Sequence, residues 1–177
     1  YNGDSVTFND AGSNVPEIEI GTTVAPDSMV VSNETKTFTF TGTNISTLGP
    51  LTKQGAGTLA LASDGNNIRG QITIAAGTLQ IGTNSLTGSL GSGDITNNGT
   101  LVMDKLDGSG TTLNGNISGS GAIIVRGGGT LNLRGTNNTF TGPATVEFGN
   151  LDIARNNALG DPNTGTTVLA GSRLGIT

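Results

Sequence analysis

The segment LTKQGAGTLALASDGNNIRGQITIAAGTLQIG, residues 51–82, decides the fold, because its main features return in IIVRGGGTLNLRGTNNTFTGPATVEFGNLDIA, residues 123–154. When residues 51–91 are laid over residues 123–163 without a gap, 13 of 41 positions are identical. The identical positions include leucines and isoleucines, which a bias toward Gly, Thr and Asn does not explain. The chain therefore contains an internal repeat, and internal repeats determine how the rest of such a sequence is interpreted.

A shorter motif, GTL followed by a variable residue and then an apolar one, recurs inside both copies and between them. Its first residues, the last in degraded form, are Gly57, Gly77, Gly99, Gly129, Gly149 and Gly171. Intervals of about 20 to 30 residues with alternating aliphatic side chains are typical of the stacked coils of a β-solenoid. In GTLQI, Leu79 and Ile81 share one face of the expected strand, and Thr78 and Gln80 share the other.

A short aliphatic strand precedes most GTL motifs, so each glycine is expected at a corner between two strands, where a Cβ would clash or φ must be positive. The six motif glycines named above, Gly57 to Gly171, are therefore predicted as structural corners. The aliphatic residues of the two copies are predicted to form the core ladder: Leu59, Leu61, Leu79, Ile81, Leu131, Leu133, Leu151 and Ile153. Asn pairs mark the longer connections, and the spacing leaves open whether their amides stack in ladders.

No stretch sustains a helical rhythm, so we expect an all-β fold with about 20–24 residues per coil. Residues 1–50 lack the GTL motif but contain strand-like segments with prolines between them, and they are expected to form a divergent start of the solenoid that serves in capping or assembly. Residues 51–177 are expected to form the solenoid proper, with units 51–122 and 123–177, the second incomplete. Because the chain stops at LGIT inside a GTL-type strand, we expect further coils beyond it or end-to-end stacking of subunits.

The composition excludes several classes of function. The chain has no Cys, His or Trp, which rules out thiol chemistry, Cys/His zinc sites, catalytic triads and disulfides. Its net charge of −5 with eight dispersed Lys and Arg argues against nucleic-acid binding. No apolar run approaches the length of a membrane span, so membrane insertion by this segment is not expected. With 3% aromatic residues, stacking platforms for sugars are scarce.

The carboxylates are the remaining candidates for acid–base or metal chemistry. Asp104 and Asp107 lie three residues apart, but two ligands are too few for Ca²⁺. The segment GSGDI, residues 91–95, resembles a single unit of a calcium-binding nonapeptide, which needs tandem copies. Five other acids show no common phase of the kind that glycan-cleaving β-helices use: Asp64, Asp94, Glu147, Asp152 and Asp161. We therefore predict no catalytic, cofactor-binding or metal residues, no cofactor and no enzymatic activity.

The run ISGSGAIIVRGGGTLNLRGTNNTFTGPATVEFGNLDIARNNALG, residues 117–160, resembles the autotransporter-associated β-strand repeat, also called the passenger-associated transport repeat. Residues 51–88 resemble it equally well. The resemblance implies a right-handed parallel β-helix in an exported bacterial surface protein, typically an autotransporter passenger or a related giant adhesin. It thus implies an extracellular or cell-surface location.

Three functions follow as hypotheses. The first is a non-enzymatic structural segment of an exported cell-surface protein, acting as a rigid spacer or display scaffold. The second is a self-assembling extracellular filament subunit whose uncapped ends join by strand addition. The third is a glycan-binding module. The expected partners are accordingly flanking solenoid coils or other copies of the chain, with a host or matrix glycan under the third hypothesis.

Overall fold

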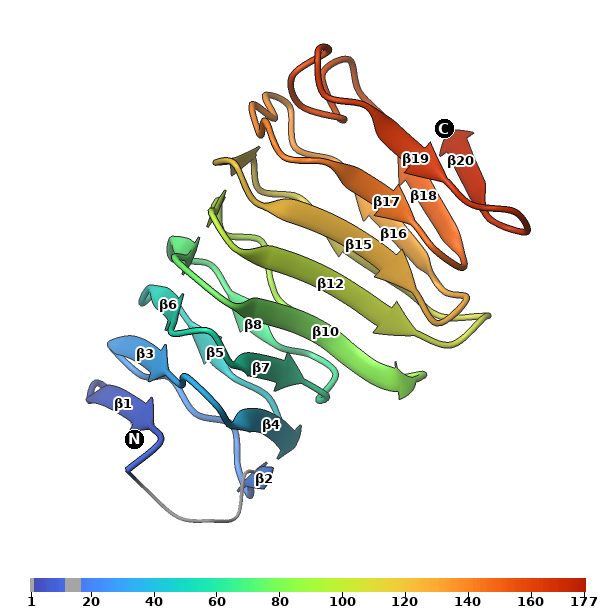
Figure 1. The fold of residues 1–177 in the computed structure, drawn as a ribbon. Helices are drawn as coiled ribbons and strands as arrows, with labels where there is room; N and C mark the ends of the chain where they lie inside the picture. The colour runs from blue at the N-terminus through green and yellow to red at the C-terminus, as the bar shows by residue number, and fades with distance from the viewer. Residues whose placement is uncertain (1, 12–16) are drawn as a thin grey trace.

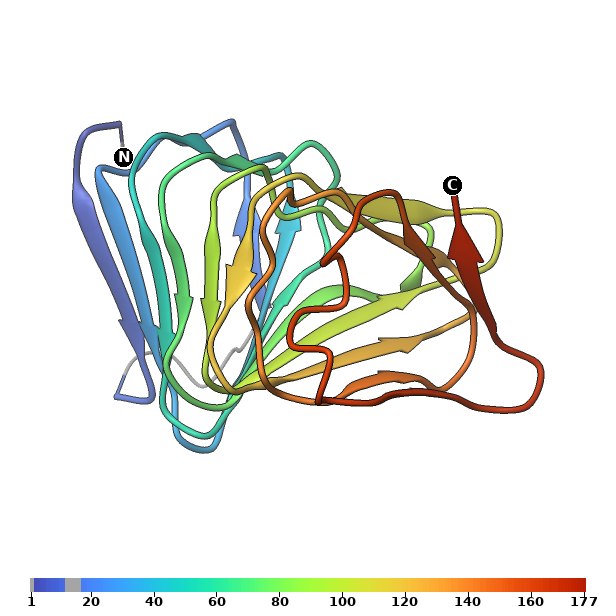
Figure 2. The ribbon, with the colours of Figure 1, turned by 90° about the horizontal axis from the view of Figure 1, so that it is seen from above.

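The computed structural model describes residues 2–11 and 17–177, and every regular element within them is a β-strand. The chain winds into a β-solenoid of about eight coils, seen from the side in Figure 1 and from above in Figure 2. All named strand pairs are parallel, and paired residues lie 20 to 23 positions apart in the sequence. The predicted all-β solenoid and its expected coil length are therefore confirmed.

Each complete coil passes through three faces in a fixed order, which we call faces A, B and C. Face A is a six-stranded sheet of β1 (Ser5–Asn9), β3 (Ser28–Ser32), β6 (Leu51–Gln54), β9 (Ile72–Ile74), β11 (Ile95–Asn97) and β14 (Ile117–Ser118). Face B is an eight-stranded sheet of β2 (Glu17–Ile20), β4 (Thr37–Gly42), β7 (Thr58–Leu61), β10 (Thr78–Ser85), β12 (Thr100–Lys105), β15 (Ala122–Arg126), β17 (Ala144–Val146) and β19 (Thr166–Val168).

Face C is interrupted, because it consists of two separate sheets. The first is the pair β5 (Ser46–Thr47) and β8 (Asn67–Ile68). The second contains β13 (Gly110–Leu113), β16 (Thr130–Leu133), β18 (Asn150–Ile153) and β20 (Arg173–Ile176). In the coil between them, only an isolated bridge from Ile68 to Gly91 continues the pairing of the described residues.

The core runs along the axis of the solenoid. It is filled by the side chains at every second position of each strand, which point inward. On face B, for example, Phe40, Leu61, Ile81 and Met103 occupy one stack in consecutive coils, and all four are buried. Residues of consecutive parallel strands are about 4.8 Å apart, so each aliphatic side chain contacts its equivalents above and below. Residues 17–50 pair with the coils that follow them and contribute Phe38, Phe40 and Ile45 to this same core.

The predicted core ladder is divided between two faces. Leu59 and Leu79 stack on face B, where the next residues in the column are Leu101 and Ile123. Leu131 and Leu151 stack on face C, in the next column around the axis. The second copy of the repeat is therefore turned by one face relative to the first. Among the described residues, no helix is long or apolar enough to cross a membrane.

Candidate functional site

The six motif glycines occupy corners of two kinds. Gly77, Gly149 and Gly171 have φ values of 67°, 121° and 85°, which L side chains rarely adopt. A Cβ on Gly77 would also collide with the carbonyl oxygens of Gly55 and Gly57 in the coil before. The remaining three have ordinary φ values, but backbone or side-chain atoms of the neighbouring coil fill the space of a Cβ: Gly57, Gly99 and Gly129.

A buried asparagine closes the corner that follows the GTL strand in the first copy of the repeat. The Asn66 side chain accepts a hydrogen bond from the backbone N–H of Ile45 in the coil before it, at 2.8 Å. Its amide nitrogen donates to the carbonyl of Ser89 in the coil after it, at 3.0 Å. One side chain thus joins three consecutive coils by direct bonds to their backbones.

Asn138, the equivalent residue of the second copy, makes the same connections on the next corner. It accepts from the backbone N–H of Ile117 at 2.8 Å and donates to the carbonyl of Ala158 at 2.9 Å. Asn66 and Asn138 bond to backbone groups and not to each other, because they lie on different corners of the solenoid. The sequence indicates that the Asn pairs lie in connections, but it does not reveal this role. The available signal is that Asn66 of the first copy aligns with an identical residue, Asn138, in the second.

Two lysines are buried among carbonyl groups. Lys53 occupies an inward position of β6, in register with Val31 on one side and Ile74 on the other, and it is fully buried. Its ammonium group donates to the carbonyls of Gln54 and Gly55 at 2.8 and 2.7 Å. Burial lowers the pKa of Lys53 below its ordinary value, because the charged form loses hydration there.

Lys105 lies at the interruption of face C. Its ammonium group donates to the carbonyls of Gly88 and Gly110 at 2.8 and 3.2 Å, and it lies 3.9 Å from a carboxylate oxygen of Asp64. Burial lowers the pKa of Lys105 as well, while the neighbouring Asp64 carboxylate partly opposes that shift. Lys105 therefore fills the gap that is left where the coil between β8 and β13 lacks a described strand on this face.

A polar hollow of about 310 Å³ opens over this gap. Asp64 forms part of its wall, with its side chain 62% exposed. Four amides and hydroxyls that also line it make no side-chain hydrogen bond within the described residues: Asn67, Ser92, Thr112 and Asn114. The hollow thus offers a carboxylate together with unpaired donors and acceptors over a buried ammonium group.

The carboxylates examined in the sequence do not converge on one place. Asp104 forms an ion pair with Arg126 at 3.0 Å, and Asp152 forms one with Arg173 at 2.8 Å. Asp107 accepts a hydrogen bond from the N–H of the residue that follows it. Asp94 accepts one from the N–H of a residue in the next coil. Across residues 2–11 and 17–177, no three acidic side chains are grouped so that they could hold a metal ion.

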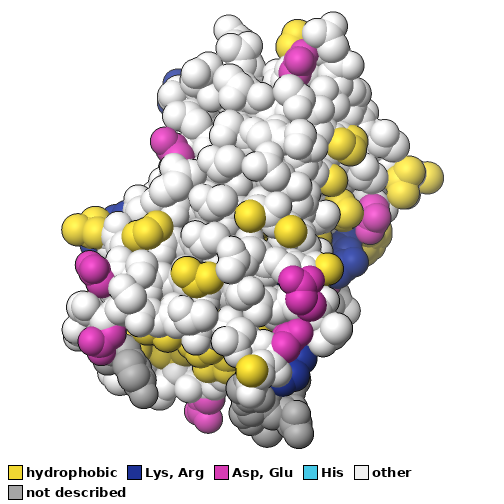
Figure 3. Space-filling model, turned by 60° about the vertical axis from the view of Figure 1, so that its left-hand side comes forward, with side chains coloured by type: hydrophobic (Ala, Val, Ile, Leu, Met, Phe, Trp, Pro, Cys, Tyr) yellow, Lys and Arg dark blue, Asp and Glu magenta, His cyan; other side chains and the backbone are white. Residues whose placement is uncertain are grey.

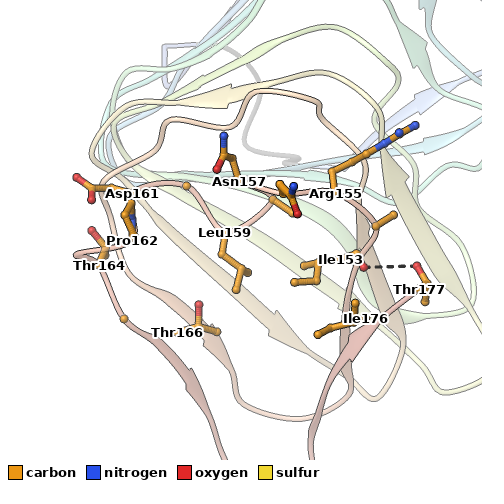
Figure 4. A pocket seen from close by; sticks show the side chains of 15 residues that line it. Ile153, Arg155, Asn157, Leu159, Asp161, Pro162, Thr164, Thr166, Ile176 and Thr177 are labelled. Atoms are coloured by element: carbon orange, nitrogen blue, oxygen red, sulfur yellow. Dashed lines mark hydrogen bonds between the residues drawn. The ribbon is translucent and has the colours of Figure 1, made fainter.

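Both ends of the solenoid carry apolar hollows. The N-terminal one, about 450 Å³, is lined mainly by inward side chains of the first two coils, including Phe8, Ile18 and Ile20. Figure 3 shows yellow apolar side chains at this lower end, while the wall above is mostly uncharged and polar. The C-terminal one, about 640 Å³, lies among Ile153, Leu159 and other residues, and Ile176 lies beside Ile153 in Figure 4.

The comparisons with known proteins identify the repeat. The family model described as passenger-associated-transport-repeat matches residues 51–81 and 123–153. No curated protein and no solved structure matches the chain. The two matches coincide with the two copies found by aligning the chain with itself, and the resemblance predicted from the sequence is confirmed. Two segments of the chain, residues 51–81 and 123–153, are therefore similar to the passenger-associated transport repeat.

Proposed function

We propose that this chain is a rigid structural segment of an autotransporter passenger, exported to the bacterial surface, that spaces or displays other parts of the protein. One observation carries this proposal. The two transport repeats form one continuous solenoid, in which a single aliphatic core and unbroken parallel pairing on face B run the whole length. Such a body resists bending, because bending would separate hydrogen-bonded strands and stacked side chains on one side.

The electrostatics and the surface chemistry support the same function. Four of the acids considered for metal binding or catalysis are instead paired with arginines or with backbone N–H groups of nearby residues. The outer wall is rich in Thr, Asn and Gly, which suits a spacer that stays hydrated and does not bind other proteins indiscriminately.

Rigidity can be tested by measuring one distance along the solenoid. The chain has no cysteine, so Thr39→Cys and Thr167→Cys allow specific spin labelling at two outward positions of face B. Six coil steps separate them, and at about 4.8 Å per step we expect their backbones to be about 29 Å apart. A single narrow distribution from pulsed electron spin resonance supports a rigid spacer, with Thr39→Cys and Thr145→Cys, one step shorter, as the calibration. A broad distribution in the folded chain would contradict it.

We propose glycan binding at the polar hollow as a second candidate function. The observation that favours it is the group of unpaired amides and hydroxyls around Asp64, since sugars are recognised through hydrogen bonds to such groups. The test is a printed array of neutral and acidic oligosaccharides. Binding that is lost in Asp64→Ala and Asn114→Ala but kept in Thr52→Ala, on face A, supports this function. An array that stays silent at high protein concentration excludes it.

A further inference from the structure

The chain contains three Asn–Gly steps, at residues 2–3, 98–99 and 114–115. Asparagine is a thermolabile residue, and before a glycine its side chain is open to attack by the backbone nitrogen that follows it. Glycine permits this attack best, since it has no Cβ to shield its nitrogen and its backbone rotates most freely. The hydrogen bonds of the fold determine which of the three steps is free to react.

The reaction needs only water. The backbone nitrogen of the glycine loses its proton and attacks Cγ of the asparagine. A bond from that nitrogen to Cγ forms, the bond from Cγ to Nδ2 breaks, and ammonia leaves with the proton that the backbone nitrogen lost. Water then opens the resulting five-membered succinimide ring at one of its two carbonyl groups. The product is either aspartate or isoaspartate, in which the main chain runs through the former side chain.

Hydrogen bonds hold two of the steps against this rearrangement. The N–H of Gly99 donates to Oδ1 of Asn97 at 3.2 Å. Oδ1 of Asn98 accepts a hydrogen bond from the N–H of Ser120 in the next coil, also at 3.2 Å. The step at residues 2–3 is held likewise, by the N–H and the carbonyl of one residue in the next coil. In both steps the attacking nitrogen and the attacked side chain are bonded, so local opening must precede the reaction.

The step at residues 114–115 lacks both restraints. Asn114 is the first residue after β13, and its exposed side chain lines the polar hollow. Within the part of the chain that the structure describes, neither this side chain nor the N–H of Gly115 makes a hydrogen bond. The hollow also admits the water that opens the ring. The attacking nitrogen, the attacked carbon and the water therefore meet at this step without a hydrogen bond to break.

We propose that Asn114 is a site of spontaneous modification, at which the chain converts its own asparagine into aspartate or isoaspartate. The conversion adds a second carboxylate to the lining of the polar hollow, which already contains that of Asp64. The hollow thus gains one negative charge over the buried ammonium group of Lys105. The inference goes beyond both proposed functions and depends on neither, because the reaction needs no ligand.

Peptide mapping by mass spectrometry tests the site. The folded chain is kept in warm, mildly alkaline buffer, and the conversion at each Asn–Gly step is followed over time by the mass gain and by the isoaspartate formed. We expect Asn114 to convert at least about tenfold faster than Asn98, because two hydrogen bonds must first open at Asn98. Equal rates, or faster conversion at Asn98, would overturn the inference.

The same chain unfolded in urea is the control. Its Asn–Gly steps have lost the hydrogen bonds of the fold, so we expect Asn98 and Asn114 to convert at similar rates. If Asn114 converts in the unfolded chain but stays unchanged in the folded one, the fold protects this step and the inference is wrong.

Anion exchange of the intact protein gives an independent readout. The aged chain should acquire a more acidic form, and Asn114→Gln should not, because glutamine would have to close a six-membered ring, which is far slower. An acidic form that appears equally fast in Asn114→Gln would contradict the assignment to this residue.

Discussion

The two copies of the transport repeat have the same local structure but lie on different sides of the molecule. In residues 51–81 the longer strands alternate between faces A and B, whereas in residues 123–153 they alternate between faces B and C. Three coils separate Leu59 from Ile123 on face B, and Leu131 comes eight residues later on face C. The offset between the copies is thus three coils and one further face.

This difference teaches that the motif encodes a strand, a corner and a strand, and does not encode a side of the solenoid. The glycine and asparagine at equivalent positions make equivalent contacts on either corner. What differs is which strands lie above and below each copy. The second copy stacks on β12 and β13, which belong to neither copy. Four predictions test how far this equivalence holds.

Truncating the same core leucine in each copy should have the largest effect. Leu79 and Leu151 are both fully buried, one on face B and the other on face C. We expect Leu79→Ala and Leu151→Ala each to lower the free energy of unfolding by about 3 kcal/mol, measured by urea denaturation. Leu86→Ala, on the exposed side, should change it by less than about 0.5 kcal/mol. If one leucine variant costs several times more than the other, the two environments are not equivalent.

Removal of the corner asparagines should come second. Each joins three coils, so Asn66→Ala and Asn138→Ala leave buried backbone groups without partners and should each cost about 2 kcal/mol. Asn67→Ala and Asn137→Ala are matched controls, because these neighbouring side chains make no hydrogen bond within the described residues. Losses as large in the controls would show that the corners depend on asparagine in general and not on these bonds.

A smaller effect distinguishes the two reasons for a corner glycine. Gly77 and Gly171 both have positive φ, but only a Cβ at Gly77 meets the backbone of the coil before it, while nothing described lies within 4 Å at Gly171. We expect Gly171→Ala to cost about 1 kcal/mol for the conformation alone, and Gly77→Ala to cost about 1 kcal/mol more. Equal melting temperatures for the two variants would mean that the neighbouring coil yields easily.

The smallest effect concerns pH and Lys53. Because burial lowers its pKa in the folded chain, the unfolded chain retains the proton over a range just below the ordinary lysine pKa. Folding stability should therefore rise with pH through that range, and the rise should be smaller in Lys53→Met, in which only Lys105 still contributes to it. The measurement is the free energy of unfolding from pH 8 to pH 10.5 in both proteins. A parallel dependence in the two would show that Lys53 does not contribute.

The coil, its length and the inward aliphatic residues could be predicted from the sequence, because period-two alternation and glycine spacing are local signals. The rotation between the copies could not be predicted. Within a copy, the spacing of the GTL motifs equals one coil, and this suggests that all GTL motifs stack in one column on one face. The sequence contains one sign of it, the longer interval between Gly99 and Gly129, which is one coil and one face.

The polar hollow and the buried lysines were missed for a physical reason. Lys53 stands two residues after Leu51 and so has the inward phase of its strand, but lysine is almost never fully buried unless it is paired, and the alternation alone does not indicate its burial. The hollow depends on the interruption of face C, which lies between the pair β5–β8 and the sheet that begins with β13. Only the paired register of all coils shows it.

The rotation by one face also bears on aggregation. Identical segments that stack directly on each other in parallel register are the hallmark of amyloid, where every chain templates the next. Here the second copy begins three coils later and on another face, so the two copies are not laid over each other. Only the short GTL strands stack on their own kind, as Thr58–Leu61 does on Thr78–Ile81. Direct stacking of like segments is therefore confined to single strands and does not extend along a whole repeat.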